Sequence, residues 1–243
     1  NAAPTPFSFA RRSTVSLHGN FGEIRLGRDF APTWWNTNVF DPGGDGIGGS
    51  LLSAQLGNAP GGANGGVFAR SSNSIGYFLP PGIGGGFYGS AQHAFGESAS
   101  SNVGNYNGLR VGYNAGKWNI AAAVGRHSTS NSNASAKLTS SNIGGFYQFD
   151  MAKLLFILAQ EKATASSGTT KQTGWLLGVT APIGAGELRA TYSSYNRKNS
   201  ADDYRKLVLG YGYNLSKRTE IYSTYAWLDN RGRADQMLSG AGL

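Results

Sequence analysis

The sequence predicts an all-β protein, and more narrowly a transmembrane antiparallel β-barrel. Three observations support this fold class. The 243-residue chain holds 37 glycines but only 14% charged residues. Large apolar residues recur with a period of two through most of its length, as they do in strands. Short turns alternate with longer polar stretches, which is typical of barrels in outer membranes.

The composition excludes several classes of protein. Glycine is about twice as frequent as in average proteins, yet no Gly-X-Y period indicates collagen. An aromatic fraction of 12% is too high for a disordered chain. The absence of cysteine excludes disulfide scaffolds, thiolate zinc sites and cysteine nucleophiles. We expect no cofactor and no metal, since only His18, His93 and His127 are available as imidazole ligands.

The alternation predicts which surface each side of a strand faces. In segment 109–114, large apolar residues alternate with Arg110 and with small or polar residues, and segments 118–125, 174–180 and 206–213 repeat the pattern. A face of glycine, alanine, serine and asparagine with occasional arginine fits a wet lumen, and the opposite face fits lipid. The apolar run 154–159 is far shorter than the about 20 residues of a membrane-spanning helix.

The connections are of two lengths. Short turns are expected where Gly, Asn, Asp or Pro gather, at 19–20, 80–82, 114–117, 150–153, 184–186 and 214–217. Longer loops are expected in the Ser-, Asn- and Thr-rich stretches 97–105, 127–135, 162–171 and 198–203. About twelve strands follow, one for each alternating segment. In chain order they begin near Phe7, Glu23, Val67, Gly86, Tyr106, Lys117, Ala136, Lys153, Gln172, Glu187, Tyr204 and Arg218.

One connection is much longer than the others. From Asp29 to Gly66 the chain carries Trp34, Trp35 and Phe40 among several glycine pairs. Loops beyond about 15 residues are uncommon and usually functional. We therefore expect this loop to fold into the lumen and narrow it.

Particular segments resemble a known family. Residues 9–17 read FARRSTVSL and residues 19–29 read GNFGEIRLGRD, and further matches lie at 74–80 and 209–219. These segments resemble the trimeric general porins of Gram-negative bacteria, above all the anion-selective porins of β-proteobacteria. The pattern G-x-F-G-x-[IV]-x-L-G-R is the most specific match, and the resemblance extends over essentially the whole chain.

The resemblance implies an architecture, a location and a function. It implies a barrel of about sixteen strands, of which residues 1–243 would form twelve within a single domain that is incomplete at both ends. A closed twelve-stranded barrel is the alternative. It further implies a homotrimer in the outer membrane, in contact with the lipid bilayer and lipopolysaccharide. The expected function is passive, non-enzymatic diffusion of ions and small hydrophilic solutes with a preference for small anions.

The resemblance also points to a pore constriction. In this family arginines face the third loop, which by resemblance is the long connection from Asp29 to Gly66, and these arginines align here with Arg11 and Arg70. Alternation alone does not decide whether Arg11 or the adjacent Arg12 faces inward, and the resemblance favours Arg11. Asp41 and Asp45 lie in the loop, where each would either oppose the arginines or stabilise a turn before Pro42 or Gly46.

Two further arginines are candidates for the lumen wall. Arg110 and Arg189 share strand parity with small or polar neighbours, so they would extend a basic ladder along the wall. Surface positions near a strand end are the alternative for both. Guanidinium groups suit such a passage because they stay charged even beside one another.

Functions of other classes stay open. A soluble all-β binding or adhesin module would bury the large alternating residues instead of exposing them. An outer-membrane lipase or protease would need a Ser/His/acid set, and His93 has no acidic residue at a diagnostic spacing. The net charge of +8 is dispersed, which argues against binding of nucleic acid.

Overall fold

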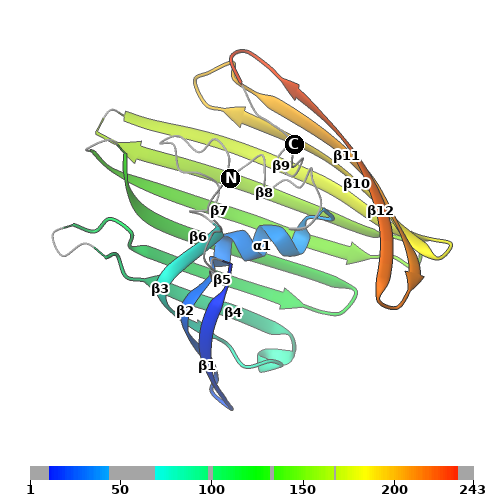
Figure 1. The fold of residues 1–243 in the computed structure, drawn as a ribbon, viewed down its shortest axis with the longest axis horizontal. Coiled ribbons are helices and arrows are strands. Elements are labelled where there is room, and N and C mark those ends of the chain that lie inside the picture. Colours follow the sequence, from blue (N-terminus) through cyan, green and yellow to red (C-terminus); the bar gives the residue numbers. More distant parts are fainter. Residues whose placement is uncertain (1–10, 44–68, 98–100, 132–133, 167, 235–243) are drawn as a thin grey trace, which may run out of the picture.

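The computed structural model describes residues 11–43, 69–97, 101–131, 134–166 and 168–234. They form twelve strands, one nine-residue helix and a short 3₁₀ turn at Ile83–Gly85 (Figure 1). The helix, α1, spans Pro32–Phe40. The strands are β1 Ser13–Gly19, β2 Gly22–Phe30, β3 Arg70–Phe78, β4 Phe87–Ala94, β5 Tyr106–Asn114, β6 Trp118–Asn131, β7 Ala134–Gln148, β8 Lys153–Ala165, β9 Gly168–Ile183, β10 Gly186–Arg197, β11 Tyr204–Ser216 and β12 Thr219–Asn230.

All twelve strands belong to one antiparallel sheet, in which each strand pairs with its neighbours in the sequence. The sheet is strongly curved, and α1 lies across its concave face (Figure 1). Within the described residues β1 pairs only with β2 and β12 only with β11, so these two strands do not meet. The predicted twelve strands and the inward fold of the third loop at α1 are confirmed, and the closed twelve-stranded alternative is wrong for the chain described.

The predicted turns are confirmed at all six places, because Gly, Asn, Asp and Pro favour chain reversal wherever they cluster. Ten of the strand starts agree with prediction within a few residues. The other two starts, near Phe7 and Val67, lie outside the described residues.

Two of the predicted long loops are wrong. β6 and β7 continue to pair as far as Asn131 and Ala134, and β8 and β9 as far as Ala165 and Gly168. Their polar composition suggested loops, but the alternation persists through them. Leu138 and Ala163 point to the concave side and are buried there, so the ladder extends beyond the apolar part of each strand. The stretches 97–105 and 198–203 do lie between strands.

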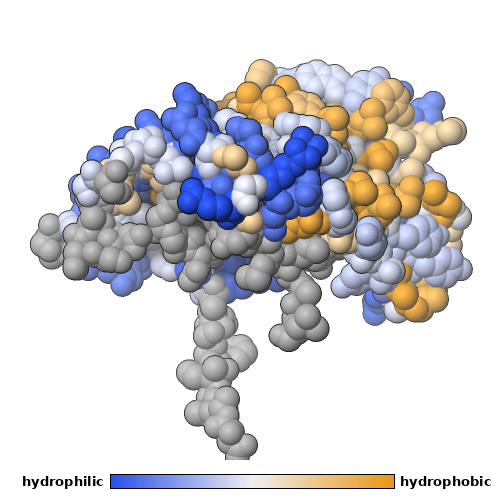
Figure 2. Space-filling model, turned by 90° about the horizontal axis from the view of Figure 1, so that it is seen from above, coloured by the Kyte–Doolittle hydropathy of each residue, from blue (hydrophilic) through white to orange (hydrophobic). Residues whose placement is uncertain are grey.

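The two faces of the sheet differ as the alternation predicts. Large apolar side chains on the convex face remain exposed, among them Leu109, Ile120, Ile143, Leu158, Leu177 and Leu209. Figure 2 shows hydrophobic residues gathered over the right-hand part of the view. The concave face carries many small and polar residues, and its larger side chains, such as Tyr106, Ile157 and Leu176, belong to the buried core that includes residues of α1. In a water-soluble protein the large apolar side chains would be buried, whereas here the apolar band faces outward.

No helix in the described part of the chain has the length and apolar character needed to span a membrane.

The end of α1 fits tightly over a glycine of the concave wall. A Cβ added at Gly144 would lie 2.4 Å from Cδ2 of Phe40, whose side chain is fully buried. Gly144→Ala is therefore expected to displace the C-terminal turn of α1, at a cost of about 1–3 kcal/mol. A lower unfolding temperature, measured by the heat-dependent change in gel migration expected of a membrane barrel, would report the effect.

Gly210→Ala provides the matched control. Gly210 also lies on the concave side, but a Cβ there would approach other atoms no closer than 3.5 Å. Equal stability of the two alanine variants would contradict a close fit between Phe40 and Gly144.

Candidate functional site on the concave face

The helix α1 is held by its surroundings more than by its own sequence. Pro32 occupies its first turn, where proline is tolerated, and the helix ends at Asp41, immediately before Pro42. Between them lie Thr, Trp, Asn and Val, which are weak helix formers, and nine residues are too few for a stable isolated helix. Its position on the wall must therefore come from tertiary contacts.

Asn36 is the centre of these contacts. Its amide nitrogen donates to Oδ1 of Asn142 at 2.8 Å and to the carbonyl of Ala121 at 3.2 Å. Its Oδ1 accepts a bond of 2.8 Å from Nε of Arg110, which also lies over the ring of Tyr88. Asn142 in turn donates to the carbonyl of Thr33 at 3.0 Å. The helix is thus bonded to β5, β6 and β7 through one buried polar network.

Aromatic rings support the first turn of the helix. Phe30 at the end of β2 stacks on Trp34 with ring centroids 4.4 Å apart. The guanidinium of Arg70 lies 4.8 Å above the ring of Phe30 and 5.8 Å from that of Trp34. Arg70 is thus positioned at the base of α1 by cation–π contacts.

A charged cluster lies beside this base on β1 and β2. Arg25 binds Glu23 with an Nε–Oε1 distance of 2.8 Å and Asp29 with an Nη1–Oδ2 distance of 2.6 Å. Arg12 reaches the same Asp29, Nε to Oδ1, at 3.2 Å. The cluster opens into a cavity of about 230 Å³ that α1 closes on one side with Pro32 and Trp35.

The structure distinguishes the two adjacent arginines. Arg12 lines the cavity, and its parity matches Ser16, whose hydroxyl donates to Glu23 within the cluster. Arg11, like Arg12, lies just before β1 and is exposed, but it is not among the described residues that line this cavity. The geometry favours Arg12 over Arg11 for a role in the cavity, and the role of Arg11 stays a prediction.

The two loop aspartates differ in what the structure describes. Asp41 is buried at the end of α1, where its Oδ1 accepts a 2.8 Å bond from the backbone of Gly43. Its carboxylate also attracts the ammonium of Lys206 on β11. Asp41 thus combines a turn-stabilising bond with an electrostatic attraction to the wall. Asp45 lies outside the described residues.

The two candidates for a basic ladder are on the concave face, but neither stands alone. Arg110 is 9% exposed because α1 covers it, so it serves the helix more than the open lumen. Arg189 binds Glu187 at 2.7 Å and Glu220 at 3.5 Å. Its charge is therefore balanced by carboxylates on β10 and β12.

Several residues of the site were not predicted from the sequence. Arg25 and Asn142 have the inward parity of their strands, so alternation places them on the concave face. Asn36 lies in a loop, where no periodicity marks it. Glu161 and Gln172, bonded to each other, and the stacked rings of Tyr195 and Tyr204 form a second buried group.

No cluster of three or more metal-ligating side chains occurs in the residues that the structure describes.

The fold and sequence match known proteins. A family model described as Gram-negative porin matches residues 1–233. The chain belongs to the Gram-negative porin family. It is 34% identical over 244 residues to outer membrane porin protein 32 of Delftia acidovorans, covering 98% of this chain and 68% of that protein.

Solved structures agree with this membership. This porin superposes on the anion-selective porin from Comamonas acidovorans with a TM-score of 0.84 and 34% identity, covering 93% of this chain and 69% of that one. The trimer form of OmpT from Vibrio cholerae has a TM-score of 0.72, with coverage of 94% and 77%, and at 15% identity it supports the fold alone.

Family membership settles the location and excludes one alternative. A Gram-negative porin is an outer-membrane β-barrel protein, so the exposed apolar belt of the convex face contacts lipid. The hypothesis of a soluble binding or adhesin module is wrong, because that module would have buried this belt.

Proposed function

We propose that this porin forms a water-filled, anion-selective channel for the passive diffusion of ions and small hydrophilic solutes. The observation that carries the proposal is the group of guanidiniums at the base of α1. Arg12 and Arg25 line the cavity there, and Arg70 lies on the ring of Phe30, which lines the same cavity. Among the described residues of this group, two carboxylates, Glu23 and Asp29, accompany the three cations.

The selectivity follows from electrostatics in a narrow passage. A surplus of fixed positive charge beside low-dielectric walls raises the local concentration of anions and repels cations. The ion pairs with Asp29 hold the guanidiniums in position while leaving the surplus in place. The 34% identity to a porin whose name states anion selectivity supports the same preference here.

The channel's wider organisation belongs to the same proposal. We infer that residues 1–243 are the main part of a single barrel domain, closed by further strands along the free edges of β1 and β12, and that three such barrels associate as a homotrimer. The protein acts without cofactor or chemical step, and lipopolysaccharide surrounds its outer half. OmpT of Vibrio cholerae, with a similar fold, is described in a trimer form.

The selectivity is tested in a planar lipid bilayer. The full-length porin is placed under a tenfold gradient of potassium chloride. The measured reversal potential should then have the same sign as the equilibrium potential of chloride. A reversal potential of the opposite sign would refute anion selectivity, and a failure to form conducting channels would refute the diffusion function itself.

A further inference from the structure

A row of cations crosses the convex face at one end of β6–β9. Arg126 is the cross-strand partner of Thr139, Thr139 of Lys162, and Lys162 of Lys171. These positions alternate with inward-facing neighbours such as Leu138, Glu161 and Gln172, so their own side chains face outward. Lys198 extends the row, since its backbone nitrogen donates to the carbonyl of Lys171. We call these residues the cation row.

Two further rows follow at steps of two residues along each strand. Next to the cation row lies an uncharged polar row, whose members are Ser141, Gln160, Thr173 and Asn196. Beyond it lies a largely apolar row, whose members are Ala122, Ile143, Leu158, Trp175 and Ser194. A step of two residues is about 6.6 Å along a strand. The charged side chains of the cation row therefore lie only two such steps from the apolar row.

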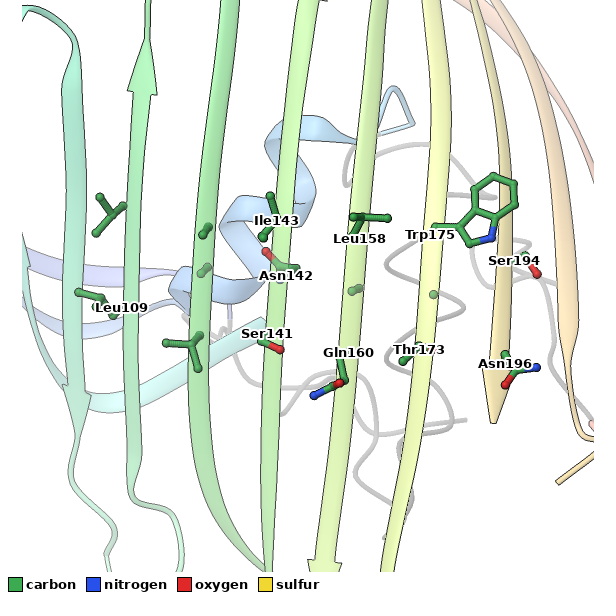
Figure 3. A pocket seen from close by; sticks show the side chains of 16 residues that line it. Leu109, Ser141, Asn142, Ile143, Leu158, Gln160, Thr173, Trp175, Ser194 and Asn196 are labelled. Carbon is green, nitrogen blue, oxygen red and sulfur yellow. The ribbon is translucent and has the colours of Figure 1, made fainter. Parts of the chain in front are cut away.

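The polar and apolar rows line a groove in the outer wall. Its volume is about 700 Å³, and it extends across β5–β10. Figure 3 shows the groove from the side opposite to α1, with Ser141, Gln160 and Thr173 in one row and Ile143, Leu158 and Trp175 in the other. The small side chains of Ala122 and Ser141 leave room between larger neighbours.

In the described part of the chain, few carboxylates lie near the cation row. The carboxylates within the described parts of β5–β10 are Glu161 and Glu187, and both point to the concave side. On the loop beyond β10, Asp203 accepts a bond from Asn196 and Asp202 pairs with Arg197, so acidic groups meet only the far end of the row. Lys162 and Lys171 stand directly opposite each other, and like charges in such pairs repel unless an anion lies between them.

The row lies at the end of the strands away from the short turns 115–117, 149–152 and 184–185. The connections 132–133 and 166–167 at the row's own end are also short, but the long connections 31–69 and 95–105 lie at that same end of the sheet. In outer-membrane barrels the longer loops are extracellular, so the cation row is at the outer leaflet. The cation row and the apolar row are therefore arranged in the same order as the charged headgroup and the acyl chains of a lipid.

We propose that this face binds one phosphorylated lipid of the outer leaflet, with its phosphate on the cation row and an acyl chain in the groove. Phosphate bridges Lys162 and Lys171 and removes their repulsion. The polar row donates to the linkage region through Gln160 and Asn196, and the apolar row receives the chain. The site is on the opposite side of the wall from the channel, so it does not depend on ion selectivity.

Native mass spectrometry of the detergent-solubilised full-length porin tests the charge requirement. Lipid A, which carries two phosphates, is the probe. Lys162→Gln with Lys171→Gln should weaken lipid A binding roughly 10–30-fold, since each lysine near a lipid surface contributes about 1 kcal/mol. Lys117→Gln with Lys217→Gln removes the same charge from exposed periplasmic turns and should leave binding unchanged. Equal losses in both double variants, or none, would overturn the proposal.

A second pair of variants tests the groove without changing charge. Ala122→Phe fills it and should also weaken lipid A binding, whereas Ala190→Phe places the same ring on the convex face outside it. If millimolar inorganic phosphate displaced lipid A, the site would be one for free anions, and the proposal of a lipid site would be contradicted. Loss of the trimer in the Lys162/Lys171 variant would show that this face is a contact between subunits, and that result would also overturn the proposal. An unchanged reversal potential in these variants separates this site from the channel.

Discussion

Asn36→Leu is expected to release α1 from the wall and to raise both the mean single-channel conductance and its open-channel noise. The change removes the two bonds that Asn36 donates to β6 and β7 and the acceptor that faces Arg110. Arg110 is nearly buried, so its guanidinium loses a bond that water cannot replace while the helix stays in place. Hydrogen bonds of this kind to charged groups contribute about 2 kcal/mol each. The lost stabilisation exceeds the intrinsic stability of a nine-residue helix, so α1 would no longer keep its position on the wall.

Asn38→Leu is the matched control for this prediction. Asn38 lies on the same helix, and within the described residues its Oδ1 accepts no hydrogen bond. The control should keep the conductance and noise of the wild type, because it adds the same side chain without removing a wall contact. If both leucine variants were equally noisy, the polar network would not be what holds α1.

Arg12→Gln combined with Arg70→Gln is expected to lower the ratio of anion to cation permeability roughly fivefold. Two unit charges about 7 Å from a permeating ion change its energy by about 1 kcal/mol in water, and salt reduces part of this. Arg25 would remain with Glu23 and Asp29, which leaves one cation against two carboxylates at the base of α1. The reversal potential under a potassium chloride gradient measures the change.

Two comparisons sharpen this second experiment. Lys117→Gln with Lys217→Gln alters total charge equally at exposed turns and should leave the permeability ratio near that of the wild type. Arg11→Gln alone should change it less than Arg12→Gln alone, because Arg12 lines the cavity and pairs there with Asp29. A larger effect from Arg11 would show that the alternation of β1 does not continue through its preceding residues.

Much of the fold could be predicted because strand periodicity and turn chemistry are local. The alternation of 109–114 requires only that successive side chains face opposite sides, and in the structure this segment lies within β5, Tyr106–Asn114. The same locality explains the error at 127–135 and 162–171. Serine and threonine suit both a loop and the exposed part of a strand, and the pairing of Lys162 with Lys171 is a contact between strands.

The site was predictable only in part. The long loop after Asp29, with its aromatic residues, indicated where the wall would be covered, and the inward parity of Arg110 was correct. Parity did not reveal that Arg110 would lie beneath α1 and not in the open lumen, or that Arg189 would pair with Glu187 and Glu220. The choice of partners depends on the curvature of the sheet and on the path of the loop.

The sequence by itself determined the class of protein. It is a β-barrel with a lipid-facing belt, short periplasmic turns, a long inward loop and a positive net charge. Only the tertiary structure decided which groups meet. Asn36 bonds residues 74 and 106 positions away, and the cation row joins Arg126 to Lys171 through three strand pairings. The physical reason is that period and turn propensity act between neighbours in the chain, whereas a hydrogen bond, an ion pair or a row of like charges exists only once curvature and register bring distant residues together.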